Sequence, residues 1–186
     1  MTPPGGPAIL IPRRIMIMGP PGSGKSTLAR QLGDALSLPV AHLDALHHAP
    51  GWLPRPRADF YADVARVVAQ PCWVIDGNYT SASAGRLARA DLVVLLDLPR
   101  HITMTRLLKR IARGYGRVRP DSAPGCPERL DWSFLGYAWT WRRAIRPRIL
   151  AAIAGYEPKT RTFSDQCSVD RFATALLTPQ VRALAP

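Results

Sequence analysis

This chain has few cysteines, no long apolar run and few acidic side chains. Its three cysteines, Cys72, Cys126 and Cys167, lie far apart and form no C-x-x-C pair. This argues against a disulfide framework or a zinc site and predicts a reducing, cytoplasmic location. No run of about 18 apolar residues occurs, so we expect no membrane-spanning helix. The apolar stretch at 8–11 is too short for a signal peptide, and residues 1–13 are expected to form a disordered leader.

Acidic residues number 13 against 25 lysines and arginines, which gives a net charge of +12. The excess is concentrated between Arg100 and Arg148, where twelve basic residues face only three acidic ones. Arginines gathered in this way can neutralise nucleotide phosphates, and a basic surface can also hold the backbone of a nucleic acid. Because no helix-turn-helix or zinc-finger pattern accompanies the charge, we favour the first interpretation for the inner arginines.

A glycine-rich segment follows the first apolar run. Residues 15–18 read IMIM and residues 19–26 read GPPGSGKS, which matches the phosphate-binding loop of nucleoside-triphosphate enzymes. A buried parallel strand is expected before the loop and a helix over Lys25–Leu36 after it. Glycine lets N–H groups turn toward an anion, and the helix N-terminus favours negative charge. The predicted ATP-binding residues are Gly19, Gly22, Ser23, Gly24, Lys25, Ser26 and Thr27, with Lys25 on the β- and γ-phosphates and Ser26 on Mg²⁺.

Apolar runs alternate with helical patterns along the rest of the chain. They predict one α/β domain over 14–178, followed by a short tail at 179–186, with a parallel sheet and with ligands at the carboxyl ends of its strands. Further strands are predicted at 39–43, 72–75, 92–96 and 160–163, and helices at 58–70, 82–90, 101–113, 133–153 (bent at Pro147) and 169–177. The proline-rich segments 46–56 and 114–129 are expected to be irregular loops.

Three predicted strands end at an aspartate, namely Asp44, Asp76 and Asp97. One of them is expected to hold Mg²⁺ together with Ser26. Asp76 is favoured because its strand lies beside the glycine-rich loop if the strand order is the one implied by the family resemblance given below. Asp97 and Asp44 remain alternatives, and each of the three is also typical of a turn or a helix N-cap. Asp44 is expected to orient, or to accept a proton from, the hydroxyl group of a phosphoryl acceptor.

Arginines of the basic half are expected to surround the transferring phosphoryl group. The helix at 101–113 carries three of them on one face. The segment at about 114–130, which is rich in glycine, proline and arginine, has the composition of a lid that closes over ATP. Arg106 is predicted to contact ATP, and Arg110, Arg117, Arg119 and Arg143 are predicted to stabilise the transition state.

The histidines and tryptophans are weaker candidates. His42, His47 and His48 lack the spacing of a metal site, so loop contacts or surface positions are favoured for them. Core positions are favoured over base stacking for four tryptophans, which are Trp52, Trp132, Trp139 and Trp141.

The order of these features resembles the adenylate-kinase-like P-loop kinases, and most of all the bacterial branch known as topology modulation proteins or cytidylate-kinase-related ATPases. The resemblance rests on GPPGSGKST (19–27), PVAHLD (39–44), PGW (50–52), WVIDGNY (73–79), ADLVVLLDLPR (90–100), GRVRPDSAPGCPERLDWSFL (116–135) and RPRIL (146–150). It implies a P-loop NTPase fold, with a five-stranded sheet in the order 2-3-1-4-5 between helices. It also implies an acceptor-binding segment at about 45–70 and a short, arginine-rich lid.

The sequence departs from that family at one informative place. Asp76 falls where adenylate kinases carry the aspartate of Asp-Gly-Phe-Pro-Arg, but residues 78–80 read Asn-Tyr-Thr. The arginine that holds the acceptor monophosphate in those enzymes is therefore missing, and Arg55, Arg57 and Arg86 are the candidates to replace it.

Together, the motifs predict an ATP- and Mg²⁺-dependent phosphotransferase that acts on a small acceptor, expected to be a nucleotide or a nucleoside. Two alternatives remain open, a kinase of a non-nucleotide small molecule and an ATP-dependent regulator that binds DNA through the basic half. No membrane partner is expected, and the sequence does not determine the oligomeric state.

Overall fold

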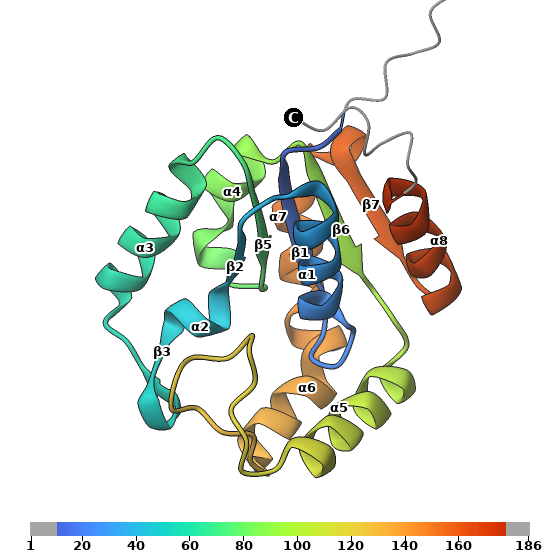
Figure 1. The fold of residues 1–186 in the computed structure, drawn as a ribbon. Coiled ribbons are helices and arrows are strands. Elements are labelled where there is room, and N and C mark those ends of the chain that lie inside the picture. The colour runs from blue at the N-terminus through green and yellow to red at the C-terminus, as the bar shows by residue number, and fades with distance from the viewer. Residues whose placement is uncertain (1–10, 178–186) are drawn as a thin grey trace, which may run out of the picture.

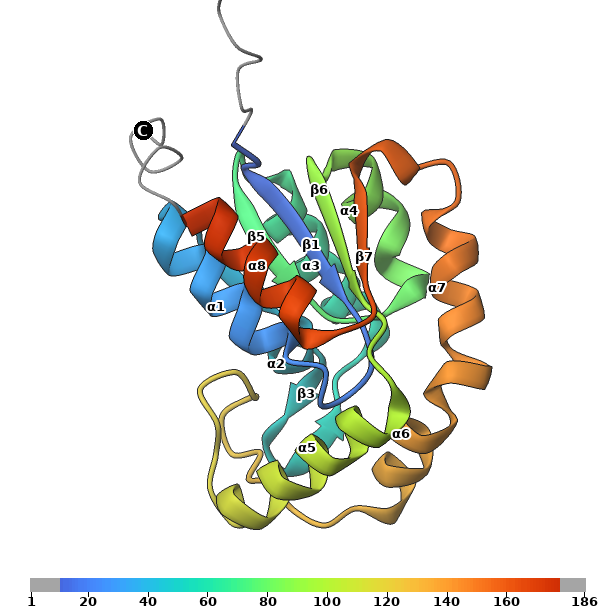
Figure 2. The same ribbon diagram turned by 90° about the vertical axis from the view of Figure 1, so that its right-hand side faces the viewer.

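The computed structural model describes residues 11–177, which form a five-stranded parallel sheet between two layers of helices (Figures 1 and 2). The strand order is β2-β5-β1-β6-β7, so the predicted order 2-3-1-4-5 is confirmed when only the strands of this sheet are counted. All neighbouring strands in it pair in parallel. The strands are β1 Arg14–Met18, β2 Val40–His42, β5 Trp73–Asp76, β6 Leu92–Leu96 and β7 Thr160–Phe163.

Helices cover both faces of the sheet because its strands alternate their side chains between two cores. Ile15 and Ile17 of β1 point to the side of α1 and α8, whereas Met16 and Met18 point to the side of α3, α4 and α7 (Figure 2). The helices are α1 Lys25–Leu36, α2 Leu43–His47, α3 Arg57–Ala69, α4 Ser83–Arg89, α5 Arg100–Gly114, α6 Trp132–Ala144, α7 Arg146–Ile153 and α8 Gln166–Leu177. None of the helices in the described part of the chain is long and apolar enough to cross a membrane.

The predicted leader and tail lie mostly outside the described residues. Positions 1–10 of the leader and the whole of 179–186 are not described. Within the leader, the backbone N–H of Arg13 donates to Asp91 Oδ2 at 3.0 Å. The chain is therefore already tied to the domain one residue before β1 begins.

Two predictions for the segment after β2 were wrong. Asp44 does not end a strand, because β2 stops at His42 and Asp44 lies in the first turn of the short helix α2. The proline-rich loop at 46–56 is not irregular throughout, since β3 (His48–Ala49) and β4 (Leu53–Pro54) pair as a small antiparallel hairpin. We call residues 48–54 the acceptor hairpin, because they lie within the segment 45–70 for which acceptor binding is expected from the sequence.

The predicted long helix at 133–153 is two helices. α6 ends at Ala144 and α7 begins at Arg146, with Ile145 between them at φ −107°. Pro147 has no N–H to donate to the carbonyl four residues earlier, so the break falls just before it. The segment 114–130, which we call the lid, begins at the last residue of α5, and its residues 115–130 form no helix or strand, only two isolated bridges, Tyr115 to Glu128 and Val118 to Pro127.

Candidate active site

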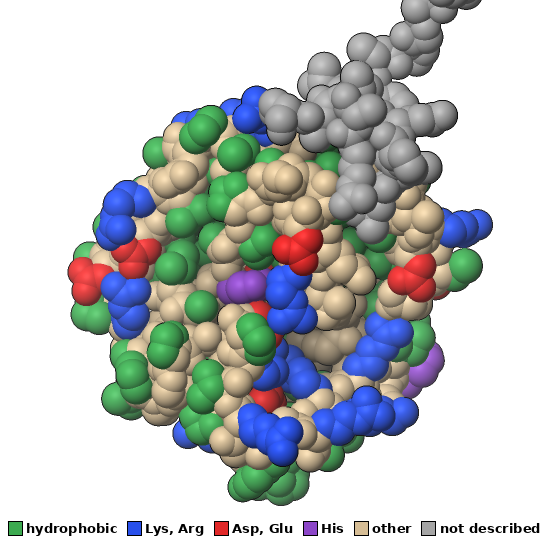
Figure 3. Space-filling model, viewed as in Figure 1, with side chains coloured by type: hydrophobic (Ala, Val, Ile, Leu, Met, Phe, Trp, Pro, Cys, Tyr) green, Lys and Arg blue, Asp and Glu red, His purple; other side chains and the backbone are tan. Residues whose placement is uncertain are grey.

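A cavity of about 990 Å³ opens at the carboxyl edge of the sheet. Its lining comes from the glycine-rich loop, from residues 76–81, from α5 and α8, and from the lid and the acceptor hairpin. Figure 3 shows lysine and arginine side chains gathered around a hollow on this side of the molecule. The net positive charge predicted for the second half of the chain is thus partly directed into the cavity.

The glycine-rich loop has the backbone that a phosphate cradle requires. Gly19, Gly22 and Gly24 have φ angles of 150°, 78° and 92°, which residues with a Cβ rarely adopt. The Ser23 hydroxyl is buried and has no hydrogen-bond partner within the described residues. A buried, unpartnered donor beside such a loop fits an anionic ligand, because it would otherwise lose hydrogen-bonding energy.

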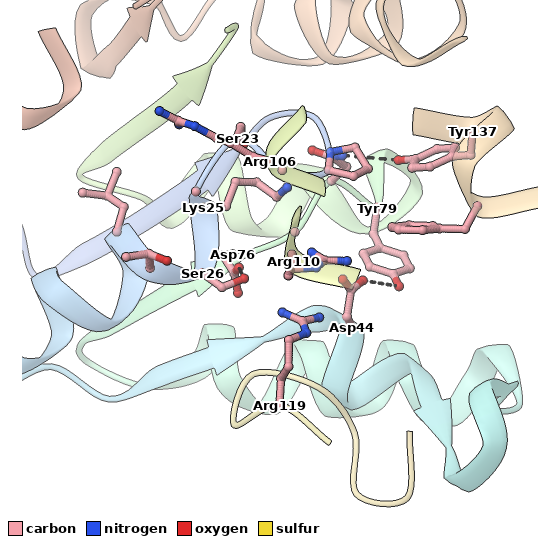
Figure 4. A pocket seen from close by; sticks show the side chains of 18 of the residues that line it. Ser23, Lys25, Ser26, Asp44, Asp76, Tyr79, Arg106, Arg110, Arg119 and Tyr137 are labelled. Atoms are coloured by element: carbon pink, nitrogen blue, oxygen red, sulfur yellow. Dashed lines mark hydrogen bonds between the residues drawn. The ribbon is translucent and has the colours of Figure 1, made fainter. Parts of the chain in front are cut away.

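Lys25, at the start of α1, points into the same space (Figure 4). Its Nζ donates to the Pro20 carbonyl at 2.9 Å. Burial of the ammonium group lowers the pKa of Lys25, although the charges of Asp76 and Asp44 partly offset this effect. A cation held by a neutral carbonyl can exchange that contact for a phosphate oxygen, so the loop and Lys25 together fit the triphosphate of ATP.

We expect Gly22→Ala to destabilise the domain. A Cβ on Gly22 would lie 2.2 Å from the Thr103 carbonyl oxygen of α5, and φ is +78° there. The left-handed backbone alone is expected to lower the free energy of unfolding by about 1–3 kcal/mol, measured by urea denaturation. Gly136→Ala is the matched control, since its Cβ would meet no atom within 4 Å in a helix interior, and should stabilise by up to about 1 kcal/mol. Equal effects of the two substitutions would contradict this prediction.

Asp76 and Ser26 form the most suitable pair for Mg²⁺. Asp76 ends β5 beside β1, and its Oδ2 accepts a hydrogen bond from Ser26 Oγ at 2.7 Å. Its Oδ1 lies 2.6 Å from His42 Nδ1. Burial by itself would lower the pKa of His42, but the hydrogen bond and the charge of Asp76 outweigh it and raise that pKa. A carboxylate and a hydroxyl in contact beside the loop are the oxygen donors that Mg²⁺ uses with nucleotides.

The other two aspartates have different surroundings. Asp97 Oδ2 lies 2.8 Å from Arg146 Nη2, and Asp97 Oδ1 lies 3.7 Å from Arg142 Nη2. These ion pairs engage both of its oxygens, and Asp97 does not line the cavity. Asp44 does line it, and its Oδ1 accepts a hydrogen bond from the Tyr79 hydroxyl at 2.9 Å. Of the three aspartates, Asp76 therefore has the surroundings that could hold a metal ion, and Asp44 faces the cavity beside Tyr79.

Arginines from α5 and the lid meet opposite the glycine-rich loop. Arg110 and Arg119 point toward Asp44 and the Lys25 side chain (Figure 4). Both arginines pair with Glu128 Oε1, at 3.2 Å for Arg110 Nε and 2.5 Å for Arg119 Nε. Burial lowers the pKa of Arg110, and the charge of Arg119 lowers it further, while Glu128 opposes the change. Arg119 Nη1 also pairs with Asp121 Oδ2 at 2.5 Å, so two carboxylates balance the two guanidiniums, and both arginines line the cavity.

Arg106 lies one turn before Arg110, on the side of α8. Its Nη1 donates to Gln166 Oε1 at 2.6 Å. Arg106 and Gln166 line the cavity together with Val169 and Ala173 of α8. This part of the cavity combines apolar surface with two polar side chains, which suits a nucleobase.

The structure does not bring two predicted arginines into the cavity. Arg117 and Arg143 are exposed and do not line it. Arg143 lies on α6, next to the buried Trp141 but directed to the surface, because the two positions differ by about 200° around a helix. Arg117 is at the outer turn of the lid, where its N–H donates to the Gly114 carbonyl.

The proposed replacements for the missing acceptor arginine are also engaged elsewhere. Arg55 Nη1 donates to Asp63 Oδ2 at 2.7 Å, and Arg57 Nε donates to the Tyr61 hydroxyl at 2.7 Å. Arg86 is buried beneath the site. None of these three arginines lines the cavity.

The lid is attached to the acceptor hairpin by a row of hydrogen bonds. Gly51 N–H donates to the Gly125 carbonyl at 2.8 Å, and Trp52 N–H donates to Cys126 Sγ at 3.3 Å. The Cys126 thiol donates to the Ala49 carbonyl at 3.2 Å, and the Trp52 indole N–H donates to the Pro127 carbonyl at 2.8 Å. A Cβ on Gly125 would lie 2.8 Å from Pro50, so the two segments also pack tightly. The lid and the hairpin therefore form one wall of the cavity.

The tryptophans lie in several environments, and His42, for which a loop contact or a surface position was favoured, instead pairs with Asp76 from strand β2. Trp141 is fully buried, as expected, but Trp132 and Trp139 are 76 % and 53 % exposed, and Trp139 packs against the Arg100 guanidinium. Trp52 lines the cavity instead of the core. No cluster of three or more metal-ligating side chains occurs among residues 11–177.

Several cavity residues were not identified from the sequence. Asn78 accepts a hydrogen bond from Gly19 N–H and donates one to the Tyr137 hydroxyl, and Glu128 pairs with two arginines. Arg129 and Gln166 also line the cavity. Of these residues, only Asn78 could have been found from the sequence, because it lies two residues after Asp76 in the segment that follows the strand. The others come from segments far from the glycine-rich loop in sequence.

Solved structures of other proteins share the fold of this chain. No protein-family model matches the sequence, and no curated protein matches it. The chain is similar in structure to a gluconokinase from Sinorhizobium meliloti, at 20 % identity and a TM-score of 0.53 over 94 % of this chain and 96 % of that one. It is also similar to a shikimate kinase from Acinetobacter baumannii in complex with shikimate, at 14 % identity and a TM-score of 0.56 over 94 % of this chain and 96 % of that one. A shikimate kinase from Aquifex aeolicus is similar at 17 % identity and a TM-score of 0.51 over 93 % of this chain and 99 % of that one. The chain thus has the α/β fold of P-loop small-molecule kinases.

Proposed function

We propose that this protein is an ATP-dependent phosphotransferase that moves the γ-phosphoryl group of MgATP to a hydroxyl group of a small anionic acceptor. The observation that carries the proposal is the cavity in which the glycine-rich loop, the Ser26–Asp76 pair and two arginines face Asp44. Phosphoryl transfer needs donor, acceptor and positive charge in one enclosed space, and this arrangement supplies all three.

The donor half of the cavity holds ATP. The N–H groups of residues 19–27 and the Lys25 ammonium bind the β- and γ-phosphates, and Ser26 and Asp76 hold Mg²⁺. When bound, Mg²⁺ neutralises phosphate charge. Arg106 and the start of α8 contact the base.

The transfer step takes place between Lys25 and Arg110. Arg110 and Arg119 stabilise the negative charge that spreads over the phosphoryl oxygens in the transition state. Glu128 holds both guanidiniums in place before the nucleotide enters. Asp44 orients the acceptor hydroxyl and accepts its proton as the new phosphate ester bond forms. Exclusion of water by the lid limits hydrolysis of ATP.

The acceptor half combines rings with positive charge. His48, Trp52 and Tyr137 offer ring faces, and Arg119 and Arg129 offer charge. A nucleotide matches this chemistry, and so does a cyclic or linear hydroxy acid. Because Arg55, Arg57 and Arg86 are engaged elsewhere, the acceptor anion would be held differently from the monophosphate of adenylate kinases.

The first experiment follows ADP release from MgATP in the presence of single acceptors. The panel contains nucleoside monophosphates, nucleosides, gluconate and shikimate, because structures similar to this one are named as a gluconokinase and shikimate kinases. We expect release that depends on one anionic acceptor above an acceptor-free control. ADP release that no acceptor changes, but that double-stranded DNA increases, would instead support the DNA-binding regulator of the topology modulation type.

We expect Asp44→Asn to lower kcat by about 100-fold or more, because the acceptor hydroxyl then lacks its proton acceptor. The affinity for MgATP should remain unchanged, since Asp44 faces the other half of the cavity. Asp59→Asn removes the same charge from an exposed position of α3 and is expected to leave kcat unaltered. Steady-state kinetics with the identified acceptor checks both variants. An Asp44→Asn variant with wild-type kcat would exclude the assigned role.

A further inference from the structure

Arg86, on α4, lies outside the cavity but contacts the backbone of its strand-end segment. It is 0 % exposed. Its Nη1 donates to the Gly77 carbonyl at 3.1 Å, and its Nη2 donates to the Asn78 and Tyr79 carbonyls at 3.1 and 2.8 Å. Its Nε donates to the Ala82 carbonyl at 3.0 Å. One guanidinium therefore holds three successive carbonyl groups as well as that of Ala82, the residue directly before its own helix.

Arg86 carries a buried charge without an acidic partner. Its hydrogen-bond partners among the described residues are all backbone carbonyls, and burial lowers its pKa to about 10, so the group stays charged at neutral pH. Burying a cation is unfavourable unless hydrogen bonds compensate it. A methionine would fill similar space without that cost. The carbonyl contacts, rather than packing, are thus the physical reason for an arginine at this position.

The segment that Arg86 holds carries side chains into the donor half of the site. Asp76, directly before it, accepts a hydrogen bond from Ser26, and Asn78 Oδ1 accepts one from Gly19 N–H at 3.0 Å. A Cβ on Gly77 would lie 2.7 Å from Leu43 Cβ, so the backbone has little room to shift. The bonds to these carbonyls therefore restrain the backbone that carries Asn78 and directly follows Asp76.

The same segment reaches the acceptor half through Tyr79. Its hydroxyl donates to Asp44 Oδ1, and Arg86 holds the Tyr79 carbonyl at 2.8 Å. Both halves of the cavity thus depend on one backbone turn, and the turn depends on one guanidinium.

We propose that Arg86 is a positioning residue for the MgATP site, acting through the carbonyls of residues 77–79 to hold Asp76 and Asn78 in place. This inference rests on the proposed function. Its consequence is specific, because Arg86 touches neither the nucleotide nor the metal. Its loss should weaken the contribution of Mg²⁺ to ATP binding more than it weakens the binding of metal-free ATP.

The test measures ATP affinity by isothermal titration calorimetry, with Mg²⁺ and with EDTA, in the wild type and in Arg86→Lys, Arg86→Met and Arg89→Met. Lysine keeps the charge but cannot span three carbonyls, so we expect the Mg²⁺-dependent gain in affinity to fall by about 10-fold. Arg86→Met should lose more of that gain. Affinity for metal-free ATP should stay within about twofold in Arg86→Lys. Arg89 lies three residues further along α4, is exposed, and is expected to be replaceable without effect.

Two results would overturn the inference. One is an unchanged Mg²⁺-dependent gain in Arg86→Lys. The other is an equal loss of affinity with and without Mg²⁺ in the Arg86 variants, which would mean that Arg86 only stabilises the fold. If Arg86→Met does not fold, the Mg²⁺-dependent gain in ATP affinity of Arg86→Lys alone decides whether the inference holds. Binding is measured without an acceptor, so a wild type that binds MgATP but transfers to no acceptor would refute the proposed function and leave this test valid.

Discussion

Replacing Lys25 with alanine is expected to reduce phosphoryl transfer by about 10³-fold or more. Lys25 is the only lysine that lines the cavity within the described residues, and its Nζ has only a neutral carbonyl as hydrogen-bond partner. Burial disfavours the charged form of Lys25, so the negative charge of a bound triphosphate would stabilise the ammonium group. Without the ammonium group, the charge that develops on the phosphoryl oxygens loses its nearest cation. Initial rates of ADP formation at saturating acceptor measure the effect.

Lys109→Ala is the control for this experiment. It removes the same charge from an exposed position of α5, outside the cavity, and should retain wild-type turnover. Both variants are expected to unfold near the wild-type temperature. Retention of wild-type activity in Lys25→Ala would refute the assignment of the glycine-rich loop as the phosphate site.

We expect Asp76→Asn to lower turnover by about 100-fold and to raise the Mg²⁺ concentration needed for half-maximal rate by about 10-fold. The carboxylate is 4 % exposed and bonds to both Ser26 and His42. An amide offers one weaker oxygen ligand in place of two charged ones, so the metal binds less tightly. The measurement is the rate as a function of Mg²⁺ at fixed ATP.

Asp97→Asn separates the metal role from a structural one. Asp97 also follows a buried strand, but its oxygens face Arg142 and Arg146. We expect this variant to lower the free energy of unfolding by about 1–2 kcal/mol and to leave the Mg²⁺ requirement unchanged. A raised Mg²⁺ requirement in Asp97→Asn, with none in Asp76→Asn, would assign the metal to Asp97 instead.

The contacts between the lid and the acceptor hairpin centre on Cys126 and Trp52. Cys126 is fully buried and uses its thiol both as acceptor, from Trp52 N–H, and as donor, to the Ala49 carbonyl. Trp52 has a φ of 65°, which is strained for a residue with a Cβ. Such strain persists where neighbouring contacts hold it, and here the lid supplies them. The lid and the acceptor hairpin are therefore held together as one wall of the cavity.

Local patterns determined most of the fold. Helix α1 has the predicted ends, and α5 and β6 lie within one residue of the predicted ends, because apolar runs, helical spacing and glycine act over a few residues. The strand order came from the resemblance to P-loop kinases and is confirmed. The glycine-rich loop, Lys25 and Ser26 were predictable for the same local reason, since the motif places all of them within eight residues.

Other features depended on contacts between distant segments. Which of Asp76, Asp97 and Asp44 could hold a metal depends on what packs beside each carboxylate: Ser26 for Asp76, arginines of α6 and α7 for Asp97, and Tyr79 for Asp44. The burial of Arg86 depends on how α4 packs against the turn after β5, and the lid–hairpin contact joins residues about 75 positions apart. The sequence by itself thus determined the chemistry of the phosphate loop, whereas only the tertiary structure decided which charges surround it, because each charge takes its role from partners that local sequence does not specify.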